Sequence, residues 1–328
     1  MPKAEGGSPR PTNSERKRTM PVTAETQAIL DMRAGATPFN EMSPQEAREA
    51  MAALRPQGEP EPVAQVHEMV VPGPAGDIPA RGYLPNDDPR NLPTLVYFHG
   101  GGWVIGDLES HDAVCRAICN RAGMSVMSVD YRLAPEATYP AAAEDCYAAV
   151  AWMNSMYDQQ GGRDDRIAVA GDSAGGNLAA VVSQMARDRG GPRIDSQILI
   201  YPVTDFSFET ESYKQNGADF GLSEVGVRWF WDLYLNDESD GAQPYASPLQ
   251  AADLANLPRS LTITAEYDPL RDEGEAYAAA LSAAGVQSSC TRYDGVIHGF
   301  VGAFQAVPEG SQALDQIAAE LRATFGMD

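Results

Sequence analysis

The chain has 328 residues, of which 43% are hydrophobic and 21% are charged, a composition typical of a soluble globular protein with a substantial core. Its formal net charge of −22 at pH 7 disfavours phosphate backbones and anionic lipid surfaces, so neither nucleic acid nor a membrane is an expected partner. The four cysteines show neither a C-x-x-C pair nor metal-ligand spacing, so we expect no metal. The glycine run at 100–102 is not followed by a phosphate-binding G-x-G-x-x-G helix start, so we expect no cofactor.

The chain begins with a segment, residues 1–19, that is rich in Gly, Pro, Ser and charge and is predicted to be disordered. This segment lacks the apolar run of a secretory signal, and no part of the sequence has an apolar run long enough to span a membrane. We therefore expect a cytoplasmic protein. Residues 20–60 carry two helical patterns, and the second starts with Ser43 as N-cap, Pro44 in the first helical position and Glu46 completing a capping box.

From residue 61 onward, strand-forming runs alternate with helical patterns. Two runs, 63–71 and 78–84, predict antiparallel edge strands. Further strands are predicted near 94–98, 125–130, 166–170, 196–200, 260–266 and 287–293, and helices near 110–121, 140–157, 174–188, 271–284 and 310–325. This alternation predicts an α/β fold, with a mostly parallel central sheet flanked by helices on both faces.

A glycine-rich loop follows the first of these alternating strands. The apolar run 95–98 leads directly into His99, Gly100, Gly101, Gly102 and Trp103. Three consecutive glycines cost backbone entropy, which is explained if their N–H groups must approach a substrate oxygen closely. Taken alone, the loop could equally be no more than a flexible connection.

A second glycine motif, Gly171-Asp172-Ser173-Ala174-Gly175, lies between a strand-forming run and a helix. The pattern G-x-S-x-G in that setting predicts a tight turn that exposes the serine hydroxyl above the sheet. The flanking glycines fit this turn because a Cβ there would collide with the neighbouring strand or helix. Ser173 is therefore a candidate nucleophile.

Together the two glycine motifs predict an oxyanion hole, which is a set of backbone N–H groups that binds negative charge on a substrate oxygen. In serine hydrolases with this tight turn, which is called the nucleophile elbow, one donor is the N–H of the residue after the nucleophile and another comes from a glycine loop. The expected donors are the N–H groups of Ala174, Gly101 and Gly102.

Such a serine also needs a histidine, which follows it in the chain. Of the four histidines, only His298 lies downstream of Ser173, in a loop predicted after the run 290–293. Chain order excludes the other three: His67, His99 and His111.

The acid of this template lies between the serine and the histidine. The strand 261–267 leads into Asp268, which Pro269 follows, and polar groups at the carboxyl ends of strands lie where α/β sheets bind ligands. Asp268 is our assignment. The alternatives are Glu266, still in or just leaving the strand; Asp272, opening the next helix; and Asp294, which precedes His298 too closely.

The alternation stops for about sixty residues between Pro202 and Ser260, which contain no good strand but include an aromatic-rich helical pattern over 225–235. This helix either packs on the surface or presents its aromatic face to an acyl pocket. Trp103, Trp229 and Phe230 are the candidate pocket residues.

The motifs resemble, in content and order, the hormone-sensitive-lipase-like esterases, also called bacterial family IV, of the α/β-hydrolase fold. The matching segments are HGGGW at 99–103, YRLAPE at 131–136, GDSAGGN at 171–177, DPLRDEG at 268–274 and HGF at 298–300. The resemblance runs from about Met20 to the C-terminus and is to the subgroup whose elbow reads GDSAG. It implies a catalytic triad of Ser173, Asp268 and His298. The supporting motif residues would be His99, Gly100, Gly171, Asp172 and Gly175.

The resemblance also implies a domain organisation and a substrate class. A helical cap would be built from residues 20–60 and the insertion 205–250, over a catalytic domain formed by 61–204 and 251–328. The expected function is carboxylesterase activity on short- to medium-chain acyl esters of small molecules. A homodimer is compatible with the family.

Two other functions remain open. A serine amidase or peptidase could use the same triad, although the sequence shows no separate peptide-binding domain. A non-catalytic receptor for a small ligand could use the same fold. Plant gibberellin receptors resemble this family but lack its catalytic histidine, whereas His298 is present here.

Overall fold

The computed structural model describes residues 22–54, 58–88, 92–159 and 166–327, so the segment 1–19 lies outside the described residues. Within them, one eight-stranded sheet has the strand order β1-β2-β4-β3-β5-β6-β7-β8. The strands are β1 (Gln65–Gly73), β2 (Gly76–Leu84), β3 (Thr94–Phe98), β4 (Ser125–Val129), β5 (Ile167–Asp172), β6 (Ser196–Ile200), β7 (Arg259–Tyr267) and β8 (Ser288–Ile297).

The sheet is parallel from β4 to β8 and antiparallel only at β1 and β2. The predicted α/β fold with a mostly parallel sheet is confirmed. One detail differs, because β2 pairs with both β1 and β4 and so leaves only β1 at that edge. At the other edge, β8 continues to Ile297, past the predicted end near residue 293, and an irregularity in the β7–β8 register lies between Ala265 and Tyr267.

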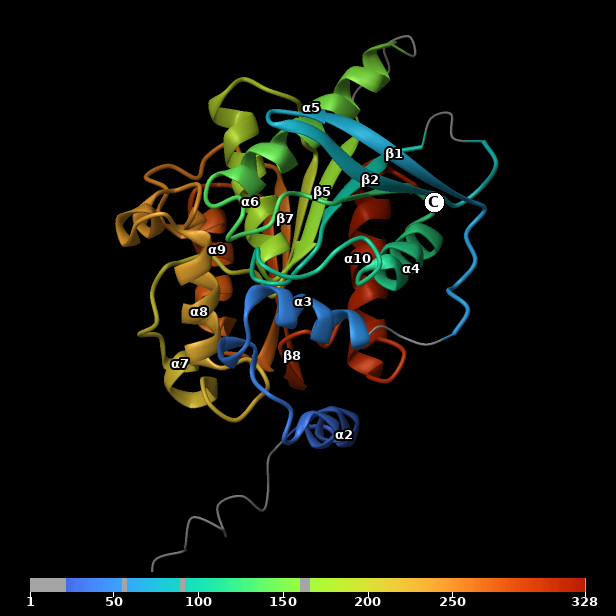
Figure 1. Ribbon diagram of the computed structural model, residues 1–328. Coiled ribbons are helices and arrows are strands. Elements are labelled where there is room, and N and C mark those ends of the chain that lie inside the picture. Colours follow the sequence, from blue (N-terminus) through green and yellow to red (C-terminus); the bar gives the residue numbers. More distant parts are fainter. Residues whose placement is uncertain (1–21, 55–57, 89–91, 160–165, 328) are drawn as a thin grey trace, which may run out of the picture.

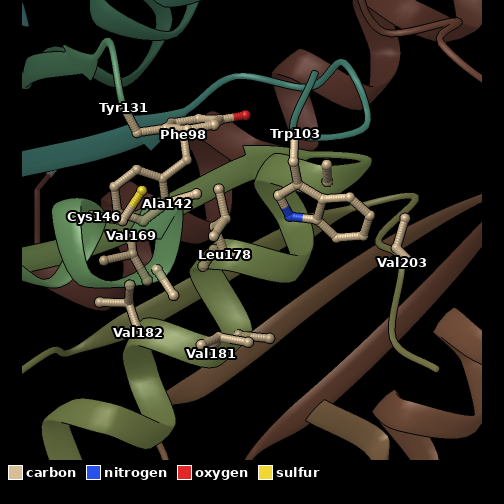
Figure 2. Close-up of a cluster of buried hydrophobic side chains, with 14 of the residues drawn as sticks. Phe98, Trp103, Tyr131, Ala142, Cys146, Val169, Leu178, Val181, Val182 and Val203 are labelled. Atoms are coloured by element: carbon tan, nitrogen blue, oxygen red, sulfur yellow. The ribbon is translucent and has the colours of Figure 1, made fainter. Parts of the chain in front are cut away.

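Helices cover both faces of the sheet (Figure 1). One face packs against α5 (Ala141–Gln159), α6 (Ala174–Asp188) and α9 (Arg271–Ala283), and the other against α4 (Asp112–Ala122) and α10 (Pro308–Phe325). Figure 2 shows part of the first interface, where Phe98 and Val169 from strands pack with Leu178 of α6 and Cys146 of α5. Burial of these apolar side chains holds β5 and α6 in place, on either side of Ser173.

The remaining helices come from two separate parts of the chain. Before the sheet lie α2 (Ala24–Arg33), the short 3-10 helix η1 (Phe39–Glu41) and α3 (Pro44–Ala53); after β6 lie α7 (Glu211–Asn216), α8 (Glu224–Tyr234), η2 (Glu238–Ala242) and η3 (Pro248–Gln250). The two parts meet where Phe39 of η1 packs edge-on against Phe230 of α8, with ring centroids 6.4 Å apart. Figure 1 shows α3 and α8 at the same end of the sheet.

The start of α3 follows the predicted capping box. The Ser43 side chain accepts a hydrogen bond from the backbone N–H of Glu46, and the Glu46 carboxylate accepts one from the backbone N–H of Ser43, 2.8 Å away. Pro44 occupies the first turn, where its missing N–H costs nothing. Within the described part of the chain, no helix is long and apolar enough to cross a membrane.

Candidate active site

Ser173 lies in a sharp turn between β5 and α6, at the carboxyl edge of the sheet. Its backbone has φ 56° and ψ −120°, a conformation that non-glycine residues rarely adopt. The turn is held because Ser173 N–H donates to the carbonyl of Ile200, 2.9 Å away, while its own carbonyl accepts from Asn177 N–H. The predicted strand–turn–helix setting is therefore present, and the strained backbone projects the serine away from the sheet.

The two flanking glycines are required by close backbone contacts. A Cβ on Gly175 would overlap the carbonyl oxygen of Phe98 in β3, and a Cβ on Gly171 would overlap the backbone of Gly175. The neighbouring backbone cannot move aside without breaking the sheet. This is the collision with strand and helix that the sequence motif predicts.

A continuous line of hydrogen bonds joins the three residues assigned from the sequence. His298 Nε2 lies 2.9 Å from Ser173 Oγ, and His298 Nδ1 lies 2.7 Å from Asp268 Oδ2. Asp268 follows directly after β7, is fully buried, and accepts a hydrogen bond from Leu270 N–H at Oδ1. His298 follows directly after β8, which brings its ring to the same edge of the sheet.

The alternative acids are engaged elsewhere or exposed. Glu266 accepts a hydrogen bond from Gly295 N–H, Asp272 pairs with Arg271, and Asp294 is exposed. Of the four carboxylates considered from the sequence, only Asp268 is hydrogen-bonded to His298.

The glycine loop after β3 is joined to the serine turn, because Gly100 N–H donates to the side chain of Asp172, the residue before Ser173. Gly101 and Gly102 have φ of 120° and 59°, which favours glycine at both positions. No described residue accepts a hydrogen bond from the N–H of Gly101, Gly102 or Ala174. Ala174 is the first residue of α6, where helix N–H groups have no partner inside the helix and attract negative charge.

A buried carboxylate lies between the glycine loop and the serine turn. Asp172 Oδ1 accepts hydrogen bonds from Tyr97 Oη at 2.7 Å and from Gly100 N–H at 3.0 Å, and it lies 3.1 Å from His111 Nε2. Burial opposes ionisation of Asp172, but His111 and Tyr97 outweigh it and lower its pKa to about 2. Asp172 is therefore a carboxylate that ties the two motifs together.

The sequence did not indicate the roles of Tyr97 and His111 in this network. Both side chains meet Asp172 from far along the chain, 75 and 61 positions away. Tyr97 belongs to an apolar strand, and chain order removed His111 from consideration as a base. No short motif pairs either residue with the elbow.

His99, the first residue of the glycine loop, is buried and stacks on Tyr131, with ring centroids 4.3 Å apart and an angle of 14° between the planes. Burial and the neighbouring His111 lower the pKa of His99 to about 4, which keeps its ring neutral near pH 7. The Tyr131 hydroxyl also donates to the His99 carbonyl, 2.7 Å away. Tyr131 of the YRLAPE segment thus fixes the first residue of the glycine loop by stacking and by a hydrogen bond.

The three aromatic residues assigned to a pocket lie in different environments. Trp103 is 1% exposed and stacks on Tyr234, with centroids 4.2 Å apart, so it belongs to the core (Figure 2). Phe230 is 8% exposed and lies against Gly102, and the partly buried Trp229 packs edge-on against Phe230. The structure thus brings Phe230, but not the Trp103 ring, to a surface of the glycine loop.

The side chains of this site suit acyl transfer. Among the described residues, no group of three or more His, Cys, Asp or Glu side chains is arranged to hold a metal ion. The arrangement combines a hydroxyl, an imidazole within hydrogen-bond distance of it, and a glycine loop that is joined to the serine turn through Asp172. These are the parts of a site that attacks a carbonyl group.

Comparison with known proteins is consistent with this geometry. A family model described as the alpha/beta hydrolase fold matches residues 95–302. The chain is 46% identical over 272 residues to the carboxylic ester hydrolase LipN of Mycobacterium tuberculosis, covering 80% of this chain and 72% of LipN. It is 42% identical over 251 residues to the carboxylesterase NlhH of the same organism, covering 75% and 78% of the two chains. A solved structure of a hyperthermophilic esterase from the archaeon Pyrobaculum calidifontis has a TM-score of 0.86 at 45% identity, covering 93% of this chain and 99% of that one.

Proposed function

Because the chain belongs to the hormone-sensitive-lipase-like branch of the alpha/beta hydrolase family and is a carboxylic ester hydrolase, we propose that it cleaves esters through an acyl-enzyme on Ser173. The observation that carries this proposal is the line of hydrogen bonds from Ser173 Oγ through His298 to Asp268, 2.9 and 2.7 Å long. That line supports the proposal because it offers an acceptor for the serine proton and a carboxylate that orients the acceptor.

In the first half of the reaction, Ser173 Oγ attacks the ester carbonyl carbon while its proton passes to His298 Nε2. The carbonyl oxygen becomes an oxyanion, which accepts hydrogen bonds from the N–H groups of Gly101, Gly102 and Ala174. His298 then gives its proton to the departing alkoxide, so that an alcohol leaves and an acyl-serine remains. Asp268 keeps Nδ1 protonated and stabilises the charged imidazole.

In the second half, water replaces the alcohol. His298 Nε2 takes a proton from the water as its oxygen attacks the acyl carbon, and the same N–H groups stabilise the second oxyanion. Collapse of that intermediate breaks the bond to Ser173 Oγ, which regains its proton from His298. The carboxylic acid leaves and the enzyme returns to its starting state.

We include in the proposal a preference for short- to medium-chain acyl groups. Phe230 fills the space on one side of Gly102, which limits the room beside the glycine loop for a long chain. The net charge of −22 further favours neutral esters over anionic ones, because a negative surface repels them. Dimerisation, cytoplasmic location and the cap boundaries stay predictions.

The two alternatives have less support. The relatives LipN and NlhH are named ester hydrolases, which favours an enzyme over a non-catalytic receptor. An amidase or peptidase could use the same triad, and it would be recognised by Ser173-dependent turnover of anilides and peptides as well as of esters.

The test compares p-nitrophenyl esters from acetate to palmitate with wild type, Ser173→Ala and the control Ser239→Ala, which alters an exposed serine. We expect turnover to peak at short or medium chains in wild type and the control, and to fall by about 10⁴-fold or more in Ser173→Ala. A p-nitrophenyl phosphonate should add one phosphonyl group to wild type, read from the intact mass, and none to Ser173→Ala. Full activity or full labelling of Ser173→Ala would overturn the proposal.

A further inference from the structure

The side chain of Asp172 places a negative charge beside the point where the reaction develops one. Asp172 immediately precedes Ser173, and its Oδ1 accepts the N–H of Gly100, the residue before the first expected oxyanion donor. The residue is 9% exposed, so little water lies around it to screen the charge. Electrostatic effects are stronger in such low-dielectric surroundings, and an uncompensated carboxylate here would oppose an oxyanion.

The geometry supplies a compensating charge at His111. This residue is buried, and its Nε2 lies 3.1 Å from Asp172 Oδ1 and 3.3 Å from Oδ2. On the other side of the ring, Nδ1 lies 2.9 Å from Ser110 Oγ. The Asp107 carbonyl, 2.8 Å from Ser110 Oγ, offers the hydroxyl proton an acceptor, which leaves the Ser110 oxygen able to accept a hydrogen bond from His111.

An acceptor therefore lies beside each ring nitrogen of His111, Asp172 at Nε2 and Ser110 Oγ at Nδ1. The Gly100 N–H also lies 3.3 Å from Nε2, but its shorter hydrogen bond, 3.0 Å, is to Asp172 Oδ1. A neutral imidazole has one N–H and can satisfy only one of the two acceptors, whereas the imidazolium donates to both. Burial opposes protonation of His111, but the Asp172 carboxylate outweighs it and raises the pKa of His111.

The other groups around His111 do not compete with this assignment. Asp107 adds a further negative field that favours the charged ring. His99, whose ring centroid lies 5.6 Å away, has a lowered pKa and is neutral. Burial raises the pKa of both Tyr97 and Cys115, which keeps their side chains neutral as well.

We propose that His111 is a positioning residue that stays protonated, neutralises Asp172, and so keeps the Gly100–Gly102 backbone ready for a developing oxyanion. This inference rests on the proposed function, since it assigns an electrostatic role within the same site. His111 itself touches no substrate. Its effect passes through Asp172 to the two backbone segments on which that carboxylate acts.

The proposal distinguishes charge from shape. If His111 serves only to fill space or to complete a hydrogen bond, replacing Asp172 as well should lower kcat further. If His111 serves to cancel the charge of Asp172, the double variant, which lacks both charges, should recover the kcat that His111→Gln loses. A double-mutant cycle separates the two, because the amide oxygen introduced by Asp172→Asn could still accept from Tyr97 and Gly100 while carrying no charge.

The experiment measures kcat and KM on p-nitrophenyl acetate for wild type, His111→Gln, Asp172→Asn, the double variant, and the exposed control His67→Gln. We expect His111→Gln to lower kcat about 10- to 100-fold, with KM changed less than about 3-fold. The double variant should recover most of that loss, and His67→Gln should match wild type. Wild-type kcat in His111→Gln, or a double variant as slow as His111→Gln or slower, would overturn the proposal.

A second measurement does not depend on the folding of His111→Gln. His111 is identified in the wild-type spectrum as the imidazole whose signals are missing from the double variant. Its two ¹⁵N chemical shifts should report two protonated nitrogens at about pH 7.5, above the ordinary histidine pKa near 6.5. A neutral ring at that pH would overturn the proposal. The outcome is distinct from failure of the proposed function, which shows as activity that survives in Ser173→Ala.

Discussion

Phe230 of α8 lies so close to Gly102 that a Cβ on residue 102 would overlap its aromatic ring. The insertion after β6 thus packs directly on the glycine loop, and Phe39 of η1 packs on the same ring from the N-terminal part of the chain. Phe230 therefore packs against the loop that carries two of the backbone donors assigned to the oxyanion hole. Any side chain at position 102 must displace this aromatic contact.

Gly102→Ala is expected to lower kcat/KM for p-nitrophenyl acetate by about 10²-fold or more, because the methyl group displaces either Phe230 or a donor N–H. Gly285→Ala is the matched control, since Gly285 also has a positive φ, 84°, but has open space around its would-be Cβ. The control should lose some stability and keep its activity. Equal kcat/KM for both variants would contradict a steric role of Phe230.

Asp268→Asn should retain substrate binding but lose about 10³- to 10⁴-fold in kcat, because the amide cannot stabilise the charged imidazole and favours the wrong tautomer. Asp294→Asn, which changes an exposed carboxylate four positions before His298, is the control and should turn over normally. The measurement is steady-state kinetics on p-nitrophenyl butyrate. Near-normal turnover of Asp268→Asn would show that another residue is the acid of the triad.

Arg48 is expected to fasten α3 to the segment beyond the glycine loop. Its guanidinium donates to the Val104 carbonyl at 2.8 Å and the Ala134 carbonyl at 2.9 Å, and it pairs with Glu136. Arg48→Gln should lower the free energy of unfolding by about 1–3 kcal/mol, since it leaves buried carbonyls without donors.

The control for Arg48→Gln is Lys214→Gln, which removes an exposed pair with Glu211 within α7. Pairs of that kind contribute about 0.5 kcal/mol or less. Urea unfolding measures both variants, and an equal loss from the two would argue against a fastening role of Arg48.

The stability of the fold should depend on Asp172 at acidic pH. Its pKa of about 2 lies below the unfolded value near 3.9, so the carboxylate stabilises the native state above about pH 4. That contribution is lost as the pH falls from about 4 toward 2. The difference in unfolding free energy between wild type and Asp172→Asn, measured in urea at a series of pH values, should shrink over this range, and a constant difference would contradict the ion pair.

Much of this site could be predicted because its signals are local. A G-x-S-x-G turn between a strand and a helix needs glycines at 171 and 175 for steric reasons that involve only neighbouring backbone. Strand ends are visible as apolar runs that stop, which placed Asp268 at the carboxyl edge of the sheet. The alternation of strands and helices likewise predicted the mostly parallel sheet.

Other features depended on packing between distant segments. The pairing of Asp172 with His111 joins positions 61 apart, and the bond from Arg48 to Val104 spans 56 positions. The sequence contains each of these residues but no pattern that links them. The extension of β8 to Ile297 arises in the same way, because its last residues pair with β7 across a register irregularity.

The local conformations, and the order of the chemical groups along the chain, could thus be read before any fold was known. Backbone sterics and periodic burial act over a few residues, so they leave short motifs in the sequence. Which groups face one another became known only once the chain was folded. Trp103 is buried in the core beside Tyr234, while Phe230 lies against Gly102. The packing of α8 determines both positions, and no local pattern in the sequence distinguishes the two aromatic residues.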